Sequence, residues 1–438
     1  MLTFSALIFW LAASTPTDTP LPPPGSERSE SIGGTTAHRY VVAAPKDTTL
    51  VVNVLQEGID LVVEVRDATG ALLLSFDSPN GIDGPETATW VSGAGGRFTV
   101  VVRPLAPGAP AGRYRLSAAT RPATKRDADL MAARLELARG YERRDAFDYA
   151  AAREAGEHAL RLMSDAVGAE ALETSDVYDL LGYVYDEIGL FDRGAEMFGT
   201  ALAIRQRTPG VSDSVRNGTE TNLAWLELGA GRYADAERRF RAVAERRMQA
   251  GELAGAANAL TGQAAALNRL QRYGDAEAVM RAVLTRAEPR MGPNATSLDY
   301  MLRHLAVAMV GAGRAAEGRA LCERALALPR ANLWDEMGRG YDLRCVGMAL
   351  AAEGRFAEAQ SRFNESLEIC VKQRGGDSLC AADTLEEQAK AARSAGDVAR
   401  SRAAFERALA IRTTVLPATH PEVVELKRSL SELPPPPG

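Results

Sequence analysis

The sequence has few residues that bind metals or carry redox chemistry. Its 438 residues include four cysteines. None of them forms a CxxC pair, so neither a zinc site nor a thioredoxin-like motif is predicted. The four histidines lie far apart in the sequence, which favours separate packing or surface roles over a metal cluster. They are His38, His158, His304 and His420.

Motifs of the common enzyme classes are missing as well. The sequence contains no GxxxxGK[ST], HExxH or GxSxG segment. Gly311, Gly313 and Gly318 superficially resemble a dinucleotide-binding loop, but they follow no strand pattern and fall at a turn between helices. Cys322 fills a position that holds phenylalanine in other repeats of the chain, which favours a small core residue over a nucleophile. We expect no catalytic residue, no cofactor and no bound metal.

An excess of basic residues is also absent. Asp and Glu number 57 against 51 Lys and Arg, which gives a net charge of -6. A general nucleic-acid binder needs a basic surface, so nucleic acid is not a predicted partner. This charge balance is compatible with a protein or peptide partner.

One long apolar run stands at the N-terminus, from Leu2 to Ala13. Its length is typical of a signal-peptide core and too short to span a bilayer as a helix, and no other segment is predicted to cross a membrane. Small residues at its end fit a signal peptide over residues 1–14. Residues 15–30 are rich in Pro, Thr and Ser and predict an extended linker. No Lys or Arg precedes the run, which leaves a mis-chosen start codon or a plain hydrophobic N-terminus as the alternative. The prediction is a periplasmic or secreted protein, and the alternative is a cytoplasmic one.

Residues 31–120 alternate between short strand patterns and turn residues. Strands at this spacing, separated by Gly, Pro and Asn, predict a small β-sandwich. The predicted strands are His38–Ala44, Thr49–Leu55, Asp60–Asp67, Ala71–Asp77, Ala88–Val91, Arg97–Arg103 and Gly112–Ala118. The runs GIDLVVEVRDATGALLLSFDSPNG and GRFTVVVRPL resemble the pre-peptidase C-terminal domain of exported bacterial proteins.

Four oxygen-bearing side chains fall close together in this segment, namely Asp77, Asn80, Asp83 and Glu86. Together they could bind calcium. Their spacing matches no standard calcium loop, and Asp and Asn are common in turns for conformational reasons. The turn interpretation is favoured.

The remaining two-thirds of the chain is a repeat. The third residues of six turn segments are Phe191, Tyr233, Tyr273, Ala315, Phe356 and Val398, at separations of 42, 40, 42, 41 and 42. Nine positions before each, and three after, the residue is small. Seven positions after each, it is Phe, Met or Cys. Such self-similarity predicts stacked helical hairpins whose two helices cross at the small residues.

This pattern resembles the tetratricopeptide repeat, and its 42-residue period resembles the kinesin-light-chain variety. A seventh repeat is predicted before the six, with Tyr149 one period ahead of Phe191. The expected fold is mainly α, with an array over residues 127–433 after the β-sandwich and a Pro-rich tail at 434–438. A sandwich followed by repeats also resembles the front half of bacterial proteins that end in a CHAT-type peptidase. No peptidase segment follows here.

Two functions are consistent with this organisation. The first is an exported, non-catalytic scaffold or adaptor that binds protein segments in the groove of the array. The alternative is a regulatory or substrate-presenting subunit, or a decayed relative, of a CHAT-type peptidase system.

The exposed positions of the first helix of each repeat give the candidate binding residues. They are Tyr183, Asn222, Trp225, Asn258, Tyr300, Arg303, Tyr341 and Arg344, and the first repeat adds an acidic patch of Asp176, Asp179, Asp186 and Glu187. Tyr300 and Tyr341 occupy equivalent positions, as do Arg303 and Arg344, so we expect them side by side. Aromatic and Arg side chains are common binding anchors, and the two arginines predict a partner with carboxylates.

The cysteines bear on the cellular location. In an exported protein they meet an oxidising environment. Cys370 and Cys380 flank Gly375 and Gly376 between two hairpins and are close enough to bridge if their Cβ atoms face each other. Helix geometry that points them apart is the alternative.

Overall fold

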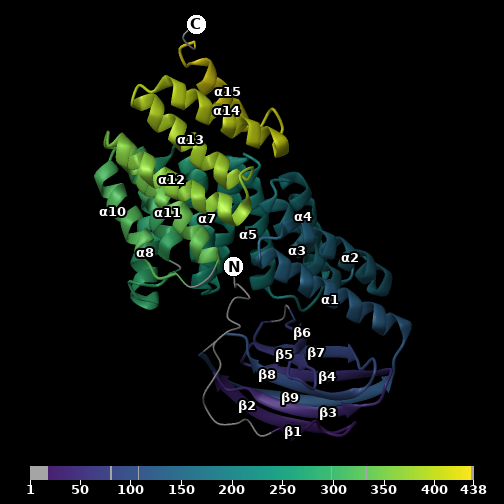
Figure 1. Ribbon diagram of the computed structural model, residues 1–438. Helices are drawn as coiled ribbons and strands as arrows, with labels where there is room; N and C mark the ends of the chain where they lie inside the picture. The colour runs from purple at the N-terminus through teal and green to yellow at the C-terminus, as the bar shows by residue number, and fades with distance from the viewer. Residues whose placement is uncertain (1–17, 79–80, 107, 297, 331–332, 436–438) are drawn as a thin grey trace. The chain divides into compact units, whose positions relative to one another are not determined.

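The computed structural model of the chain describes residues 18–78, 81–106, 108–296, 298–330 and 333–435. The signal-peptide prediction therefore lies outside the described residues, as does Asn80. Within them the chain forms a β-sandwich followed by helices (Figure 1). No described helix is long and apolar enough to cross a membrane.

The sandwich consists of two sheets. One has the order β1-β3-β8-β5-β6 and the other the order β2-β9-β4-β7. The strands are β1 (Thr19–Pro20), β2 (Glu27–Gly34), β3 (His38–Ala44), β4 (Thr48–Glu57), β5 (Leu61–Arg66), β6 (Leu72–Phe76), β7 (Gly84–Val91), β8 (Gly96–Pro104) and β9 (Ala109–Pro122). Apart from β1 with β3, neighbouring strands are antiparallel. Alternating apolar residues and the fully buried Trp90 fill the space between the sheets.

All seven strands predicted from the sequence are present, but the linker prediction is wrong in part. Residues 19–20 form β1, and residues 27–30 belong to β2, which pairs antiparallel with β9 from Glu27 to Gly34. The segment Glu27-Arg28-Ser29-Glu30 has no apolar alternation, because it is an edge strand held by backbone hydrogen bonds rather than by burial. A pattern of hydrophobicity could not reveal it.

Fifteen helices are described after the sandwich. They are α1 (Lys125–Asp145), α2 (Tyr149–Val167), α3 (Leu172–Glu187), α4 (Phe191–Arg207), α5 (Asp213–Gly229), α6 (Tyr233–Gln249), α7 (Leu253–Arg269), α8 (Tyr273–Met291), α9 (Leu298–Gly311), α10 (Ala315–Leu326), α11 (Leu333–Ala352), α12 (Phe356–Arg374), α13 (Leu379–Ser394), α14 (Val398–Val415) and α15 (Pro421–Ser431). We call the first helix of each hairpin its A helix and the second its B helix. Tyr149 and the six turn residues found in the sequence are the first residues of the seven B helices, so the predicted register is confirmed.

The small residues of the repeat allow close packing of large side chains. A Cβ atom added at Gly182 would lie 2.8 Å from the ring of Phe198, and one added at Gly347 would lie 2.6 Å from the ring of Phe363. Both phenylalanines are fully buried. The A helix therefore needs glycine or alanine at this position because the B helix places an aromatic ring against it.

By its packing the described chain divides into two compact units. The first unit takes in the sandwich and the chain through Arg144, with Ala150–Leu181 and Thr200–Arg216. The second takes in Asp145–Tyr149, Gly182–Gly199 and the chain from Asn217 onward.

Within the first unit, the sandwich is fixed to α1 by one carboxylate. Asp127, in the first turn of α1, accepts two hydrogen bonds from the Arg121 guanidinium, at 2.5 and 2.6 Å. It also accepts one from the Thr124 amide at 2.9 Å and one from the Thr49 hydroxyl of β4 at 3.1 Å. The Arg121 side chain holds the pKa of Asp127 below its usual value, with help from Thr124 and Thr49. The junction between sheet and helix is thus a hydrogen-bonded joint rather than a free linker.

Within the second unit, the segment between α14 and α15 contacts the α3–α4 and α5–α6 turns. His420 donates from Nε2 to the carbonyl oxygen of Gly229 at 2.9 Å, and its ring stacks near Phe191 with centroids 6.5 Å apart. A Cβ atom added at Gly231 would lie 2.5 Å from Pro421. A cavity of about 320 Å³ lies at this contact, lined by the α3–α4 and α5–α6 turns and by the segment between α14 and α15. We call this set of contacts the closing contact.

Candidate functional site

Two tyrosines and two arginines alternate on α9 and α11. The Arg303 guanidinium lies over the ring of Tyr300 at 4.9 Å and over the ring of Tyr341 at 5.4 Å. The Arg344 guanidinium lies over Tyr341 from its own helix, at 5.3 Å. The sequence prediction that these four residues project side by side is confirmed. We call this set the Tyr–Arg row.

Both arginines of the row are already paired with carboxylates. Arg303 donates to Asp342 at 2.8 Å and lies 3.7 Å from Asp299, while Arg344 donates to Asp383 at 3.0 Å. Asp342 is fully buried and also pairs with Arg330. Arg303 is only 8% exposed, so the expectation of an exposed Arg303 is wrong. The physical reason is that the next A helix places an acid 39 residues later, opposite each arginine.

Trp225 joins the row from an earlier hairpin. Its ring lies 5.8 Å from Tyr300 and packs edge-on against Phe240 at 4.8 Å. Trp225 and Tyr300 belong to α5 and α9, and the helix between them in sequence, α7, carries small residues such as Ala265. The rings of Trp225 and Tyr300 are therefore partly buried by these contacts and partly accessible.

The remaining predicted residues have mixed outcomes. Asn222 donates to the Tyr183 hydroxyl at 2.7 Å, so these two act as a pair. Tyr183 in turn packs edge-on against Phe198, at 5.0 Å. Asn258 is half-buried on α7, in the position that Tyr300 and Tyr341 occupy on their helices, and no described contact joins it to the row.

His304, one turn from Tyr300, was not among the predicted binding residues. Its ring packs edge-on against Tyr300 at 4.7 Å. Burial first, and then the charges of Arg303 and Arg269, lower the pKa of His304 to about 3. The imidazole is therefore neutral at physiological pH and acts as part of the aromatic surface.

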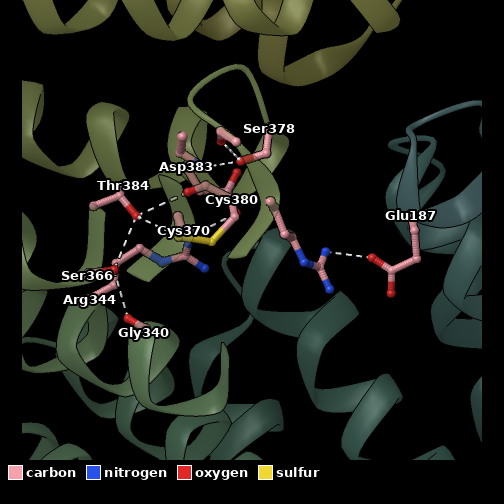
Figure 2. The surroundings of a disulfide bond; sticks show 12 residues. Glu187, Gly340, Arg344, Ser366, Cys370, Ser378, Cys380, Asp383 and Thr384 are labelled. Atoms are coloured by element: carbon pink, nitrogen blue, oxygen red, sulfur yellow. Dashed lines mark hydrogen bonds and ion pairs between the residues drawn. A yellow bond between two sulfur atoms is a disulfide. The ribbon is translucent and has the colours of Figure 1, made fainter. Parts of the chain in front are cut away.

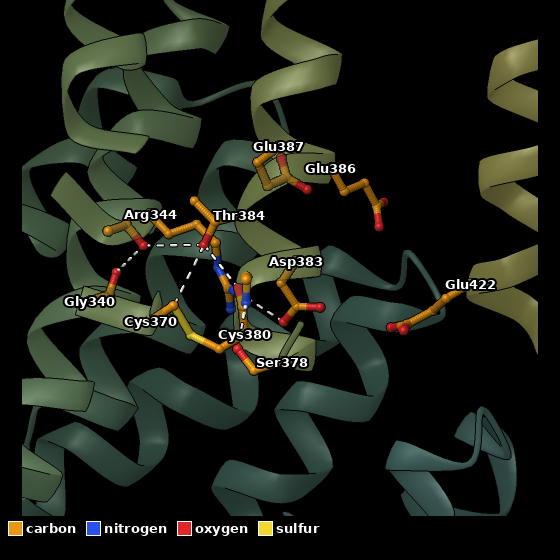
Figure 3. A network of polar contacts seen from close by, with 12 residues as sticks. Gly340, Arg344, Cys370, Ser378, Cys380, Asp383, Thr384, Glu386, Glu387 and Glu422 are labelled. Carbon is orange, nitrogen blue, oxygen red and sulfur yellow. Dashed lines mark hydrogen bonds and ion pairs between the residues drawn. A yellow bond between two sulfur atoms is a disulfide. The ribbon is translucent and has the colours of Figure 1, made fainter. Parts of the chain in front are cut away.

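An ion-pair network continues from Arg344 to the C-terminal hairpins, and Figure 3 shows its first pair, Arg344 with Asp383. Asp383 bridges Arg344 and Arg412, and Arg412 also pairs with Glu386 and, at 3.2 Å, with Glu422. Although burial opposes it, Lys390 and Arg412 hold the pKa of Glu386 down at about 2. Glu422, at the start of α15, pairs with Arg269 of α7 as well, at 2.9 Å. Sequence reasoning missed this network because its members are up to 153 positions apart.

Two disulfides link successive hairpins. Cys370 on α12 and Cys380 on α13 are bonded, with Cα atoms 5.7 Å apart, and Thr384 and Ser366 surround them (Figure 2). The bridge that the sequence left open is therefore formed. Cys322 on α10 is fully buried, as predicted for a core residue, and it is also bonded to Cys345 on α11, which the sequence analysis did not predict. The repeat pattern identified its position but not its partner, which faces it from the next A helix.

The loop closed by the Cys370–Cys380 disulfide carries another long-range ion pair. Arg374 donates to Glu187 at 2.5 Å, the contact drawn to Glu187 in Figure 2. The same guanidinium lies over the rings of Phe147 and Tyr149, at 5.3 and 5.8 Å. Glu187, a residue of the predicted acidic patch, is thus neutralised from within the chain.

The possible calcium ligands of the sandwich have turn and core roles. Asp83 accepts from the Gly58 amide at 2.8 Å, and Glu86 accepts from the Ser78 amide at 2.6 Å and from Gln56 at 3.3 Å. Burial raises the pKa of Glu86 to about 8. Among the described residues, no group of three or more His, Cys, Asp or Glu side chains is arranged to hold a metal ion.

Comparison with known proteins agrees with this fold. Residues 343–414 match the tetratricopeptide repeat family. The helical part of the chain is a tetratricopeptide-type array, preceded by a β-sandwich. No curated protein matches the sequence.

Several solved structures are similar to this chain. The Rap conjugation gene regulator of plasmid pLS20, in complex with the Phr* peptide, has a TM-score of 0.54 at 15% identity, over 66% of this chain and 75% of that one. A Rap protein complexed with competence and sporulation factor has a TM-score of 0.52 at 14% identity, over 66% and 76%. The pre-peptidase C-terminal domain of the Bacillus anthracis collagenase is 19% identical over 24% of this chain and all of that domain, with a TM-score of 0.21. At these identities the first two similarities establish a shared fold.

Proposed function

We propose that this protein is a non-catalytic scaffold or adaptor that binds a protein or peptide segment on the A-helix side of its array. The observation that carries the proposal is the Tyr–Arg row with Trp225. Here half-exposed aromatic rings from α5, α9 and α11 meet at one place. Rigid aromatic surface on a fixed helical frame is the usual composition of a binding hot spot. Two of the similar solved structures are complexes, one with competence and sporulation factor and one with the Phr* peptide, which supports a similar use of the fold.

The test removes the rings without disturbing the ion pairs. In the double variant Tyr300→Ala with Tyr341→Ala, Arg303 and Arg344 keep their carboxylate partners. Partners are first recovered with the wild-type protein from the native organism, and their affinities are then measured by calorimetry. We expect at least a tenfold loss of affinity, the effect of about 1.4 kcal/mol. The double variant Met248→Ala with Val371→Ala, at exposed positions, is the control. Unchanged affinity in a folded Tyr300/Tyr341 variant would contradict the proposal.

We also propose that the protein is exported. Two disulfides in one array support this, because such bonds persist in oxidising compartments and are rare in the cytosol of mesophiles. Cell fractionation combined with alkylation of free thiols tests it. We expect a periplasmic or secreted protein that gains no alkyl groups until it is reduced. A cytosolic protein with four reactive thiols would refute export.

A further inference from the structure

The predicted acidic patch on α3 is neutralised by internal ion pairs at all but one of its carboxylates. Within the first unit, Arg205 pairs with Asp176 at 2.8 Å and with Asp179 at 2.6 Å. Within the second unit, Arg374 pairs with Glu187. These contacts leave one acid of the patch, Asp186 on α3.

The arginines of the Tyr–Arg row, and Arg269 of α7, are occupied. Arg303 and Arg344 have Asp342 and Asp383, and Arg269 has Glu422. An acidic segment would therefore have to displace an internal carboxylate from each arginine. This removes the basis for the sequence expectation that the partner carries carboxylates.

Asp186 is the exception in this balanced arrangement. Its side chain has no hydrogen bond and no ion pair within the described part of the chain, and it is half-buried. Burial first, and then the neighbouring charge of Glu187, raise the pKa of Asp186 to about 7, although Arg374 opposes this. A carboxylate placed so unfavourably lacks a cation.

The surroundings of Asp186 suit the side chain of a basic residue. Tyr183 lies one helical turn earlier on α3, and its ring is half-exposed. Tyr300 of α9 lies within electrostatic reach of Asp186, whose charge is among those that, after burial, raise the pKa of the Tyr300 phenol. Aromatic rings accept the apolar stem and the cationic head of Lys or Arg, while a carboxylate pairs with the head.

We propose that Asp186 is the anchor for a Lys or Arg side chain of the segment bound on the A-helix side, next to Tyr183 and Tyr300. The occupant is a protein segment with a basic residue rather than an acidic one. This inference rests on the proposed function, because it names the chemistry of the partner at the same site. It rests on charge complementarity, since Asp186 is the acid that the internal ion pairs leave over.

The experiment is a selection from a phage-displayed library of random decapeptides, with the full-length protein as bait. Selected peptides are synthesised, labelled with fluorescein and titrated by fluorescence anisotropy against wild type, Asp186→Asn and the control Asp192→Asn. Asp192 is an acid of α4 that is 88% exposed. Circular dichroism confirms that each variant is folded.

We expect the selected peptides to share a Lys or Arg, and Asp186→Asn to weaken their binding at least tenfold while Asp192→Asn leaves it unchanged. Replacing the shared Lys or Arg with Gln should cause a similar loss with wild type and little further loss with Asp186→Asn. Selected peptides without a shared basic residue, or equal binding by Asp186→Asn, would overturn the cation site but leave the scaffold function intact. A selection that enriches no peptide would count against both.

Discussion

The His420 imidazole donates a hydrogen bond from Nε2 to the backbone carbonyl of Gly229, 191 positions earlier in the chain. Its other nitrogen, Nδ1, accepts from the Glu422 amide and so caps the N-terminus of α15. One side chain thus both caps the last helix and attaches it to the turn after α5. The array is held by this contact as well as by stacking of neighbouring hairpins.

The closing contact can be tested with a matched pair of glycines. Gly231 and Gly354 occupy equivalent turns with φ of 76° and 79°, but an added Cβ meets Pro421 only at Gly231 and open space at Gly354. Alanine should cause similar backbone strain at both positions. We expect Gly231→Ala to cost about 1–3 kcal/mol more, because of the added clash. Urea unfolding gives the difference, and hydrogen exchange should show faster exchange around residues 415–422 in Gly231→Ala alone. Equal effects of the two changes would refute a stabilising role.

The joint between the sandwich and α1 should depend on pH. The folded-state pKa of Asp127 is below its unfolded value, so its contribution is present above about pH 4 and is lost as pH falls through the folded-state pKa. We expect Asp127→Asn to destabilise the protein by about 1–3 kcal/mol at pH 7 and by progressively less in acid. Thermal unfolding between pH 2 and pH 7 measures this. Asp129→Asn, which removes only the half-buried partner of the exposed Lys125, should change little.

The two disulfides should contribute comparable stability. They close segments with separations of 10 and 23 residues, for which the loss of chain entropy in the unfolded state predicts about 3 kcal/mol each, slightly more for the longer one. The double variants Cys370→Ser with Cys380→Ser and Cys322→Ser with Cys345→Ser test each bridge by denaturant unfolding. A reductant should lower the unfolding free energy of each double variant by the contribution of the one disulfide that it retains. If it lowers only the wild type, the bridges are not independent.

Asp186 should make the unliganded protein less stable at neutral and alkaline pH. Its folded-state pKa of about 7 lies above its unfolded value, so the folded state binds more protons and its stability falls as pH rises from about 4 to beyond 7. We expect Asp186→Asn to stabilise the protein by about 1–3 kcal/mol at pH 8, because it removes an unpaired, half-buried charge. The gain should vanish near pH 4, where Asp186 is protonated. Melting temperatures of wild type and Asp186→Asn at pH 4 and pH 8 measure this difference. A variant less stable than wild type at pH 8 would show that Asp186 has a stabilising partner.

Local patterns predicted more of this molecule than its long-range contacts. The register of the hairpins was found because a large B-helix residue, such as Phe198 or Phe363, needs a small A-helix residue opposite it. The same pairing recurs in each repeat, so it is visible in the sequence. The Tyr–Arg row followed from the same register. The ion pairs that occupy Arg303 and Arg344 did not, because the register was built from small and large apolar positions and does not show which charges of neighbouring A helices face each other. The contact of His420 with Gly229 was equally hidden, since nothing in either local sequence indicates the other.

The disulfides also determine how the array would respond to tension. Each one joins the B helix of one hairpin to the A helix of the next, α10 to α11 and α12 to α13. If the ends of the chain were pulled apart, the hairpins from α9 to α14 could not separate one after another. The two bridged segments, of 23 and 10 residues, could not be extended while the disulfides are intact. This would shorten the fully stretched chain by about 80 Å and about 35 Å. The three hairpins from α9 to α14 therefore form a crosslinked block that can bear a load while the hairpins before it, from α1 to α8, unravel.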